Sequence, residues 1–456
     1  MSDFIQAGYL VAAILFALGL KGLARPRTAV RGNLLGAVGM LIAVVVTITD
    51  KAIISYWVLA AGLVVGTAVG TVLAVKVQMT GVPELVALFN GLGGLASVFV
   101  VVASYVERTD LGTYDDTFIA AAGVSALIGA TTFTGSVVAF GKLRESLTTW
   151  RSGATTYING ALSVAGMIAL LGFFLQPLSA AWLITIVVIS AIAGITLVLP
   201  IGGADMPVVI ALLNSLSGLA AAATGFALDN SLLIIAGSLV GASGLILTQT
   251  MCIAMNRTLP NVLFGSISGG ATVDPNDVYE GKVRSTSADD VALILDSADN
   301  VMIIPGYGLA VAQAQHAVRD LARLLEQRGT TVTFAIHPVA GRMPGHMNVL
   351  LAEAEVDYED LIEMADANPM FAQTDVTIVI GANDVVNPVA RDPDSAIAGM
   401  PILDADKSRT VIVIKRSLSP GFAGIPNPLF ANDNSLMLFA DAKQAVGDIT
   451  KALNGV

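Results

Sequence analysis

The distribution of apolar residues along the chain changes character near residue 257. Before this point, nine segments are long and apolar enough to span a bilayer, and each must be a helix because lipid cannot satisfy the backbone polar groups. They lie near residues 4–20, 34–50, 53–76, 84–106, 117–140, 156–175, 180–199, 206–227 and 231–254. The pattern predicts a polytopic helical membrane domain over residues 1–256.

A second pattern follows. Residues 257–290 are polar and rich in Gly, Ser, Asp and Asn, which predicts a linker. Over residues 291–456, short apolar strands then alternate with helical stretches. The strands are expected at Val301–Ile304, Val332–Ile336, Val376–Ile380, Val411–Ile414 and Leu436–Phe439. This alternation predicts an α/β domain with a doubly wound parallel sheet, Rossmann-like in its organisation.

Glycines mark two places in the pattern. In the membrane half, Gly62, Gly66 and Gly70 and the cluster 91–94 favour close helix packing. In the second half, the stretch from Gly306 to Val311, Gly-Tyr-Gly-Leu-Ala-Val, follows the first strand and opens a helix expected to run to about Arg328. There, glycines let a backbone approach phosphates. Because Gly306 and Gly308 occupy such positions, the loop predicts a dinucleotide-binding site.

The ends of the other strands bear on which dinucleotide is bound. A domain specific for NAD carries an acidic residue about 20 positions after the glycine loop, to bind the ribose 2′-hydroxyl. Here the second strand ends in His337 and Pro338, whereas the fourth ends in Lys415, Arg416 and Ser417. Two cations and a hydroxyl suit a 2′-phosphate and favour NADP; the alternative is a solvated strand end. Arg342 is a second candidate for phosphate contact.

The turn after the third strand, Gly381-Ala382-Asn383-Asp384, falls on the same edge of the sheet. It could be a simple turn. Alternatively, Asp384 beside a nicotinamide would respond to the redox state of the cofactor through its protonation.

Composition narrows the function classes. Of the 456 residues, 55% are hydrophobic and only 13% are charged, well below the charged fraction of a typical soluble protein. The net charge of −11 argues against nucleic acid as a partner. The single cysteine, Cys252, excludes a disulfide framework, and no metal site is predicted. The first apolar run lacks the features of a cleaved signal peptide, so we expect a retained span.

The loops between the spans differ in charge. Positive charges gather in the odd-numbered loops, at Lys21, Arg25, Arg27, Arg31, Lys76, Lys142, Arg144, Arg151 and Arg257. The even-numbered loops are mainly acidic. The positive-inside rule therefore predicts an N-terminus outside and a cytoplasmic second half.

Polar groups within the spans are few and mostly neutral. Asn90 and Asn214 stand out because each lies six to nine residues inside a span that begins with an acidic residue and a proline. They could make ordinary interhelical hydrogen bonds or line a polar pathway, and the residues leave both readings open. The membrane half contains no histidine.

Several longer stretches resemble one family, the β subunits of proton-translocating NAD(P) transhydrogenases. The resemblance runs from end to end, and its most specific stretches are residues 83–87, 203–209, 305–315, 336–353, 381–388, 397–401, 415–417 and 427–430.

This resemblance implies that the chain supplies most of the membrane domain and the NADP(H)-binding domain. A separate α-type subunit would bind NAD(H), and the complete unit would be a dimer in the inner (cytoplasmic) membrane. The implied NADP contacts are Tyr307, Val339, Ala340, Gly341, Arg342, Met343, Pro344, Gly381, Ala382, Asn383, Asp384, Gly399, Met400, Lys415, Arg416, Ser417, Gly421, Phe422, Asp441 and Ala442. The implied proton path includes Asn90, Ser136, Asp205, Asn214 and Arg257.

Two positions depart from the family pattern. The family has a histidine where this chain has Asn90, which puts the place of the proton relay in question. It has a tyrosine where this chain has Phe422, so a hydroxyl contact from the loop over the nucleotide is lost although ring stacking can survive.

Two functions fit the sequence. The first is a component of a redox-driven proton pump, in which hydride passes between two nucleotides; because this chain has one nucleotide loop, an NAD(H)-binding partner is implied. The second is a transporter or channel whose cytoplasmic domain senses a nucleotide without turning it over. Redox activity in the presence of the partner separates them.

Overall fold

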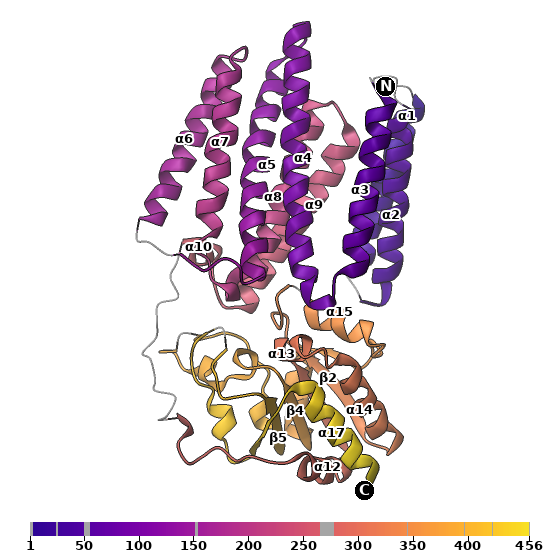
Figure 1. Ribbon diagram of the computed structural model, residues 1–456, viewed down its shortest axis with the longest axis vertical. Coiled ribbons are helices and arrows are strands. Elements are labelled where there is room, and N and C mark those ends of the chain that lie inside the picture. Colours follow the sequence, from indigo (N-terminus) through magenta and orange to yellow (C-terminus); the bar gives the residue numbers. More distant parts are fainter. Residues whose placement is uncertain are drawn as a thin grey trace. The chain divides into compact units, whose positions relative to one another are not determined.

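The computed structural model describes residues 3–23, 26–49, 55–150, 154–264, 278–343, 345–395, 397–421 and 423–455. Contacts divide the chain into two compact units, Met1–Thr248 and Gln249–Val456. Figure 1 shows that the first unit is all-helical and that the second contains the sheet.

Nine helices of the described residues are long and apolar enough to cross a membrane, which confirms the expected number. They are α1 (Asp3–Leu23), α2 (Pro26–Ile48), α3 (Tyr56–Lys76), α4 (Val82–Leu111), α5 (Asp116–Leu143), α6 (Thr155–Leu175), α7 (Ala180–Val198), α8 (Met206–Ala227) and α9 (Ser231–Ala254). Most of the apolar window of α5 and of α8 is buried, so these two helices form the centre of the membrane unit.

Glycines bring α4 and α5 together. A Cβ on Gly94 would lie 2.7 Å from the carbonyl oxygen of Gly129, and a Cβ on Gly129 would lie 2.7 Å from that of Gly94. Only two glycines allow the helix backbones to approach so closely. On α3, by contrast, a Cβ on Gly62, Gly66 or Gly70 would meet nothing within 4 Å, so the expected close packing is not found at these three positions.

The second unit is built on a six-stranded, wholly parallel sheet of order β3-β2-β1-β4-β5-β6, which confirms the doubly wound fold. The strands are β1 (Asn300–Pro305), β2 (Thr331–Ile336), β3 (Leu361–Glu363), β4 (Val376–Ile380), β5 (Thr410–Lys415) and β6 (Ser435–Phe439). Strands β1, β4 and β5 are buried along nearly their whole length, as parallel strands covered on both faces must be.

Different elements cover the two faces of the sheet. On one face, α14 (Gln315–Gln327) packs against β2 and α17 (Ala442–Gly455) packs against β5, with α12 (Ala288–Asp296) beside α17 (Figure 1). The other face is covered by short helices: α16 (Met364–Ala367), η3 (Asn368–Gln373), η4 (Asp384–Val386), η6 (Ala405–Lys407) and η7 (Pro428–Ala431). The described residues of this unit also form α10 (Leu259–Phe264), α13 (Tyr307–Val311), α15 (His346–Glu353) and η5 (Pro388–Arg391). In the first unit, η1 (Met79–Gly81) and η2 (Gly203–Asp205) precede α4 and α8.

The helix expected from the glycine loop to about Arg328 is interrupted. Helix α13 ends at Val311 and α14 begins at Gln315, because Gln313 between them has a left-handed backbone with φ of 48°. The short α13 therefore belongs to the loop after β1, and α14 is the helix that packs against β2.

Candidate functional site

The order of the strands reverses between β1 and β4, and the turns that follow these two strands meet. The amide of Gly306 donates to the carbonyl of Ile380 at 2.8 Å, and the amide of Gly308 donates to that of Gly381 at 2.9 Å. In parallel sheets, ligands bind outside the carboxyl ends of the strands at such a switch point.

Only glycines fit where these turns meet. A Cβ on Gly306 would lie 2.4 Å from the carbonyl oxygen of Gly381 and 2.5 Å from Cα of Ala382. A Cβ on Gly381 would lie 2.5 Å from Cα of Gly308, and Gly381 also has a left-handed φ of 63°. The glycines predicted for phosphate approach thus also serve a backbone contact between two turns.

Asp384 connects the turn after β4 to the loop after β5. Its Oδ2 accepts a hydrogen bond from the amide of Ala423 at 3.0 Å. A Cβ on Gly421 would lie 2.5 Å from the carboxylate, so the loop passes close to Asp384 only because residue 421 is glycine. The turn containing Asp384 and the loop containing Gly421 are therefore adjacent.

Lys415 lies at the end of β5 and points into this region. Its ammonium donates to the carbonyl of Ser419 and lies 5.1 Å from the centre of the Phe430 ring. Burial lowers the pKa of Lys415, and the nearby Asp384 carboxylate partly offsets this. Lys415 and Asp384 are thus two partly buried groups of opposite charge near each other at the carboxyl edge of the sheet.

Arg416 points differently from Lys415. Its guanidinium pairs with the carboxylate of Asp441, two residues after β6, and its side chain is 68% exposed. The hydrogen bond from Arg416 lowers the pKa of Asp441. Asp441 is followed directly by α17, which begins at the buried Ala442. Two residues that the resemblance assigns to one site therefore contact each other, and Ser417 beside them bonds to Ser419 at 2.9 Å.

The loop after β2, residues Val339–Met343, is held by two buried histidines. His337 accepts the amide of Val339 at Nδ1, 3.2 Å away, so its proton lies on Nε2 and is donated to the carbonyl of Pro401 at 2.8 Å. Pro401, which accepts this hydrogen bond, directly follows Gly399 and Met400 in the chain. Burial lowers the pKa of His337 to about 4, which keeps the ring neutral.

His346 holds the other end of this loop. Its Nδ1 accepts the amide of Arg342 at 3.0 Å, and burial, followed by the Arg342 charge, lowers its pKa to about 4. A Cβ on Gly341 would lie 2.5 Å from this ring, and φ of Gly341 is 109°. The Arg342 guanidinium lies 4.5 Å from the centre of the Tyr307 ring, so the loops after β1 and β2 meet through these two side chains.

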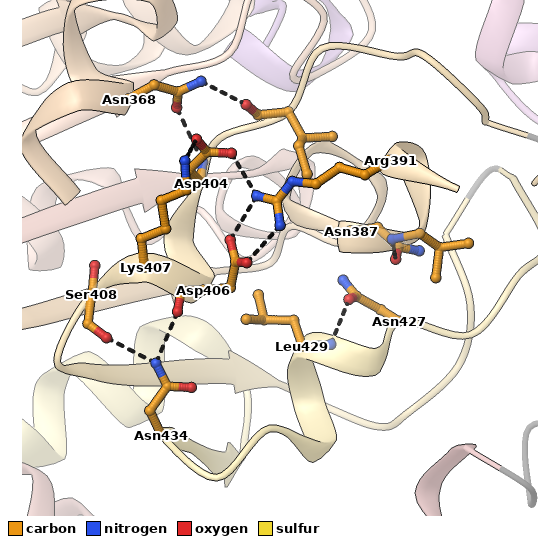
Figure 2. A network of polar contacts seen from close by, with 12 residues as sticks. Asn368, Asn387, Arg391, Asp404, Asp406, Lys407, Ser408, Asn427, Leu429 and Asn434 are labelled. Carbon is orange, nitrogen blue, oxygen red and sulfur yellow. Dashed lines mark hydrogen bonds and ion pairs between the residues drawn. The ribbon is translucent and has the colours of Figure 1, made fainter. Parts of the chain in front are cut away.

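A polar network supports the segment that carries Gly399 and Met400 (Figure 2). Arg391 bridges Asp404 and Asp406, with 2.6 Å to each carboxylate, and Lys407 also binds Asp404. Asn368 donates to the carbonyl of Ile402 at 2.9 Å and accepts the amide of Asp404 at 3.1 Å. The segment after residue 399 is thus fixed at its far end.

Sequence reasoning missed two buried asparagines at the site, Asn387 and Asn427 (Figure 2). The side chain of Asn387 donates to the carbonyl of Pro426 at 3.1 Å, and that of Asn427 donates to the carbonyl of Asn383 at 3.0 Å. Each also accepts the amide two residues ahead and so starts a short helix. A signal was present, because both asparagines precede a proline, and Asn-Pro favours turn initiation.

The residues predicted for the proton path are divided between the two units. The side chain of Asn90 on α4 donates to the hydroxyl of Ser136 on α5 at 3.0 Å, and Ser217 on α8 lies 3.5 Å from the Asn90 carbonyl. Asp205 is buried at the start of α8, and Asn214 is half-buried on the same helix. Arg257 belongs to the other unit, where it donates to the carbonyl of Asn261 at 3.3 Å. Predicted contacts Pro344 and Phe422 lie outside the described residues.

In the part of the chain that the structure describes, nine apolar helices and a parallel sheet with interlocked glycine turns at its switch point define a multi-pass membrane protein with a domain of the dinucleotide-binding type. The family model "NAD(P) transhydrogenase beta subunit" matches residues 5–452, and the chain belongs to this family. The NAD(P) transhydrogenase subunit beta of Rhodospirillum rubrum is 45% identical over 462 residues, covering 98% of this chain and 99% of the relative. A second sequence of that subunit, from a defined strain of the same organism, gives the same values.

Proposed function

We propose that this chain is the NADP(H)-binding and membrane subunit of a proton-translocating transhydrogenase. The observation that carries the proposal is the meeting of the Gly306 and Gly381 turns at the switch point, with Lys415 and Arg416 at the end of the neighbouring strand. A dinucleotide needs close backbone approach at its phosphates, and a 2′-phosphate needs cations beside it.

The residues fit NADP(H) better than NAD(H). The turns at Gly306–Gly308 and Gly381–Asp384 would face the pyrophosphate, and Arg416 would bind the 2′-phosphate, with Arg342 as a second cation. The residue after β2 is not a carboxylate but the neutral, inward-turned His337. The loop from Lys415 to Phe422, with Asp441, would complete the nucleotide contacts.

The nucleotides supply the hydride chemistry, so the protein needs no acid–base group for direct transfer. This chain's residues would bind and orient one nucleotide, and Asp384, with Lys415 nearby, would put a carboxylate beside it. An α-type partner would bind NAD(H) and present it to this chain, because the sequence has a single glycine-rich nucleotide loop. The complete unit would be a dimer in the inner membrane, with the N-terminus outside and the nucleotide domain cytoplasmic.

Proton movement would use the polar contact between α4 and α5. Asn90 and Ser136 cannot titrate near neutral pH, so they would orient water or a neighbouring protonatable group. Asp205, Asn214 and Arg257 would line or couple the same path. Coupling requires NADP and NADPH to favour different states of the protein.

The test is reconstitution. NADH and an NADP analogue are added to the purified chain, to its α-type partner and to the two together. Reduction of the analogue is then followed. The proposal predicts turnover only when both are present, and intact-mass spectrometry then reports the stoichiometry. Turnover by this chain alone would reveal a second site. Nucleotide binding without turnover in the complete mixture would instead favour a transporter or channel that senses the nucleotide.

A further inference from the structure

Tyr279 lies on the stretch of chain that leads from the membrane half into the sheet, and its side chain is buried in the second unit. The residue is 9% exposed and belongs to the hydrophobic cluster that includes Leu429 and Phe430 of η7 and Val386 of η4. Its hydroxyl accepts a hydrogen bond from the backbone amide of Asn427 at 2.7 Å. Burial raises the pKa of Tyr279, so the hydroxyl stays neutral at physiological pH.

Asn427 connects this contact to the nucleotide site. It is fully buried, and its side-chain amide donates to the carbonyl of Asn383 at 3.0 Å. Asn383 directly precedes Asp384, whose carboxylate accepts the amide of Ala423. A continuous series of contacts thus runs from Tyr279 through Asn427 to the turn and loop at the site.

We propose that Tyr279 is a positioning residue for the nucleotide site, which it acts on through Asn427. The inference rests on the function proposed above and names a residue that determines the affinity of this chain for NADP. Without the hydroxyl, the buried Asn427 amide loses its acceptor, and conformations in which the loop from Lys415 to Asn427 separates from the Gly381–Asp384 turn become more populated. The apparent affinity for nucleotide falls by the fraction of molecules that leave the competent conformation.

The neighbouring segment keeps this effect local. The carbonyl of Arg284 and the amide of Thr286 bond to Met437 on β6, at 2.8 Å and 2.9 Å. Ser287 and Asp290 then form a capping box at the start of α12. These contacts do not involve the Tyr279 hydroxyl, so the segment stays docked when that hydroxyl is removed.

The test measures NADP affinity and thermal stability on the full-length chain in detergent, for wild type, Tyr279→Phe and a matched control. The control is Thr377→Val, which removes another buried hydroxyl of this unit, bonded to Ser408 at 2.6 Å. Thr377 lies near the start of β4, at the opposite edge of the sheet from the site. We expect both variants to lower Tm, but only Tyr279→Phe to weaken NADP binding, by about tenfold.

A second variant, Asn427→Asp, keeps the amide that bonds to Tyr279 and the oxygen that accepts the Leu429 amide, but removes the donor to Asn383. It should also weaken NADP binding. The double variant with Tyr279→Phe should lose less than the product of the two single effects, because both break one series of contacts.

The outcomes separate this inference from the proposed function. If the wild-type chain binds no NADP, the proposed function fails, and this inference fails with it. If wild type binds NADP but Tyr279→Phe binds it equally well at a lower Tm, Tyr279 is only a packing residue and the inference is wrong. Equal losses of affinity in Tyr279→Phe and Thr377→Val would overturn it too. If Tyr279→Phe does not fold, unchanged affinity in Asn427→Asp overturns it.

Discussion

Replacing Arg416 with alanine tests the selectivity for NADP. A charge-assisted contact to phosphate contributes about 1.5–3 kcal/mol. Arg416 is 68% exposed, which favours the lower part of this range. Its removal also frees the Asp441 carboxylate, which would then repel the nearby phosphate. We therefore expect a loss of about 2 kcal/mol, or roughly thirtyfold in Kd.

The assay is calorimetric titration of the intact chain with NADP and with NAD. A matched control is Arg409→Ala, because Arg409 directly precedes β5 at the opposite edge of the sheet. The control should bind NADP like wild type, and Arg416→Ala should leave the weak binding of NAD unchanged, since NAD has no 2′-phosphate. Unaltered NADP affinity in Arg416→Ala, or equal losses for both nucleotides, would refute the assignment of Arg416.

Three further predictions concern charge and protons. Asp384→Asn removes a charge beside Lys415 but keeps an oxygen for the Ala423 amide, so Tm should hold while coupled turnover falls about tenfold; turnover equal to wild type would contradict this. The folded state holds His337 neutral down to about pH 4, whereas the unfolded chain protonates it near pH 6.5. His337 should therefore contribute about 3 kcal/mol to a fall in stability, followed by denaturant unfolding, as pH drops through this window, and His346, whose pKa burial also lowers to about 4, should add to this fall. A His337→Gln variant that keeps the same pH dependence would show that another group is responsible. Because Asn90 cannot titrate, we expect a histidine in a membrane helix of the partner to carry the proton; one such histidine variant should stop proton pumping in vesicles, and Asn90→His should partly restore it. Full pumping in every partner variant would leave a water chain as the path.

The sequence predicted the elements whose length and apolarity are extreme. The nine candidate spans of the described residues were all predicted from apolar runs alone, because lipid leaves no alternative to a helix. Five strands were found because a parallel strand covered on both faces is a continuous apolar run. The sixth, β3, escaped because Leu361–Glu363 has only three residues and is not fully buried.

Features set by tertiary contacts were not predictable. The break between α13 and α14 depends on a left-handed glutamine, Gln313, a conformation that its residue type does not suggest. The pairing of Arg416 with Asp441 depends on the register of β5 against β6, in which Lys415 lies opposite Phe439. The glycine loop itself was found, but its contact with the turn at Gly381 required the strand order.

The roles of buried polar residues were equally hidden. The bond between His346 and the Arg342 amide follows from the fold of the loop. Tyr279 fell in a stretch expected to be a polar linker, and only the structure shows its ring in the core. A single polar residue gives no periodic signal, so its partner cannot be found from the sequence.

The coupling of hydride transfer to proton movement is the central claim, and one measurement tests it directly. The chain and its NAD(H)-binding partner are reconstituted into vesicles that contain a pH-sensitive dye, and NADH and NADP are added together. The account predicts that NADPH formation and a change in internal pH begin together, and that Asp384→Asn reduces both by the same factor. Hydride transfer at the full rate in sealed vesicles without any pH change would contradict it.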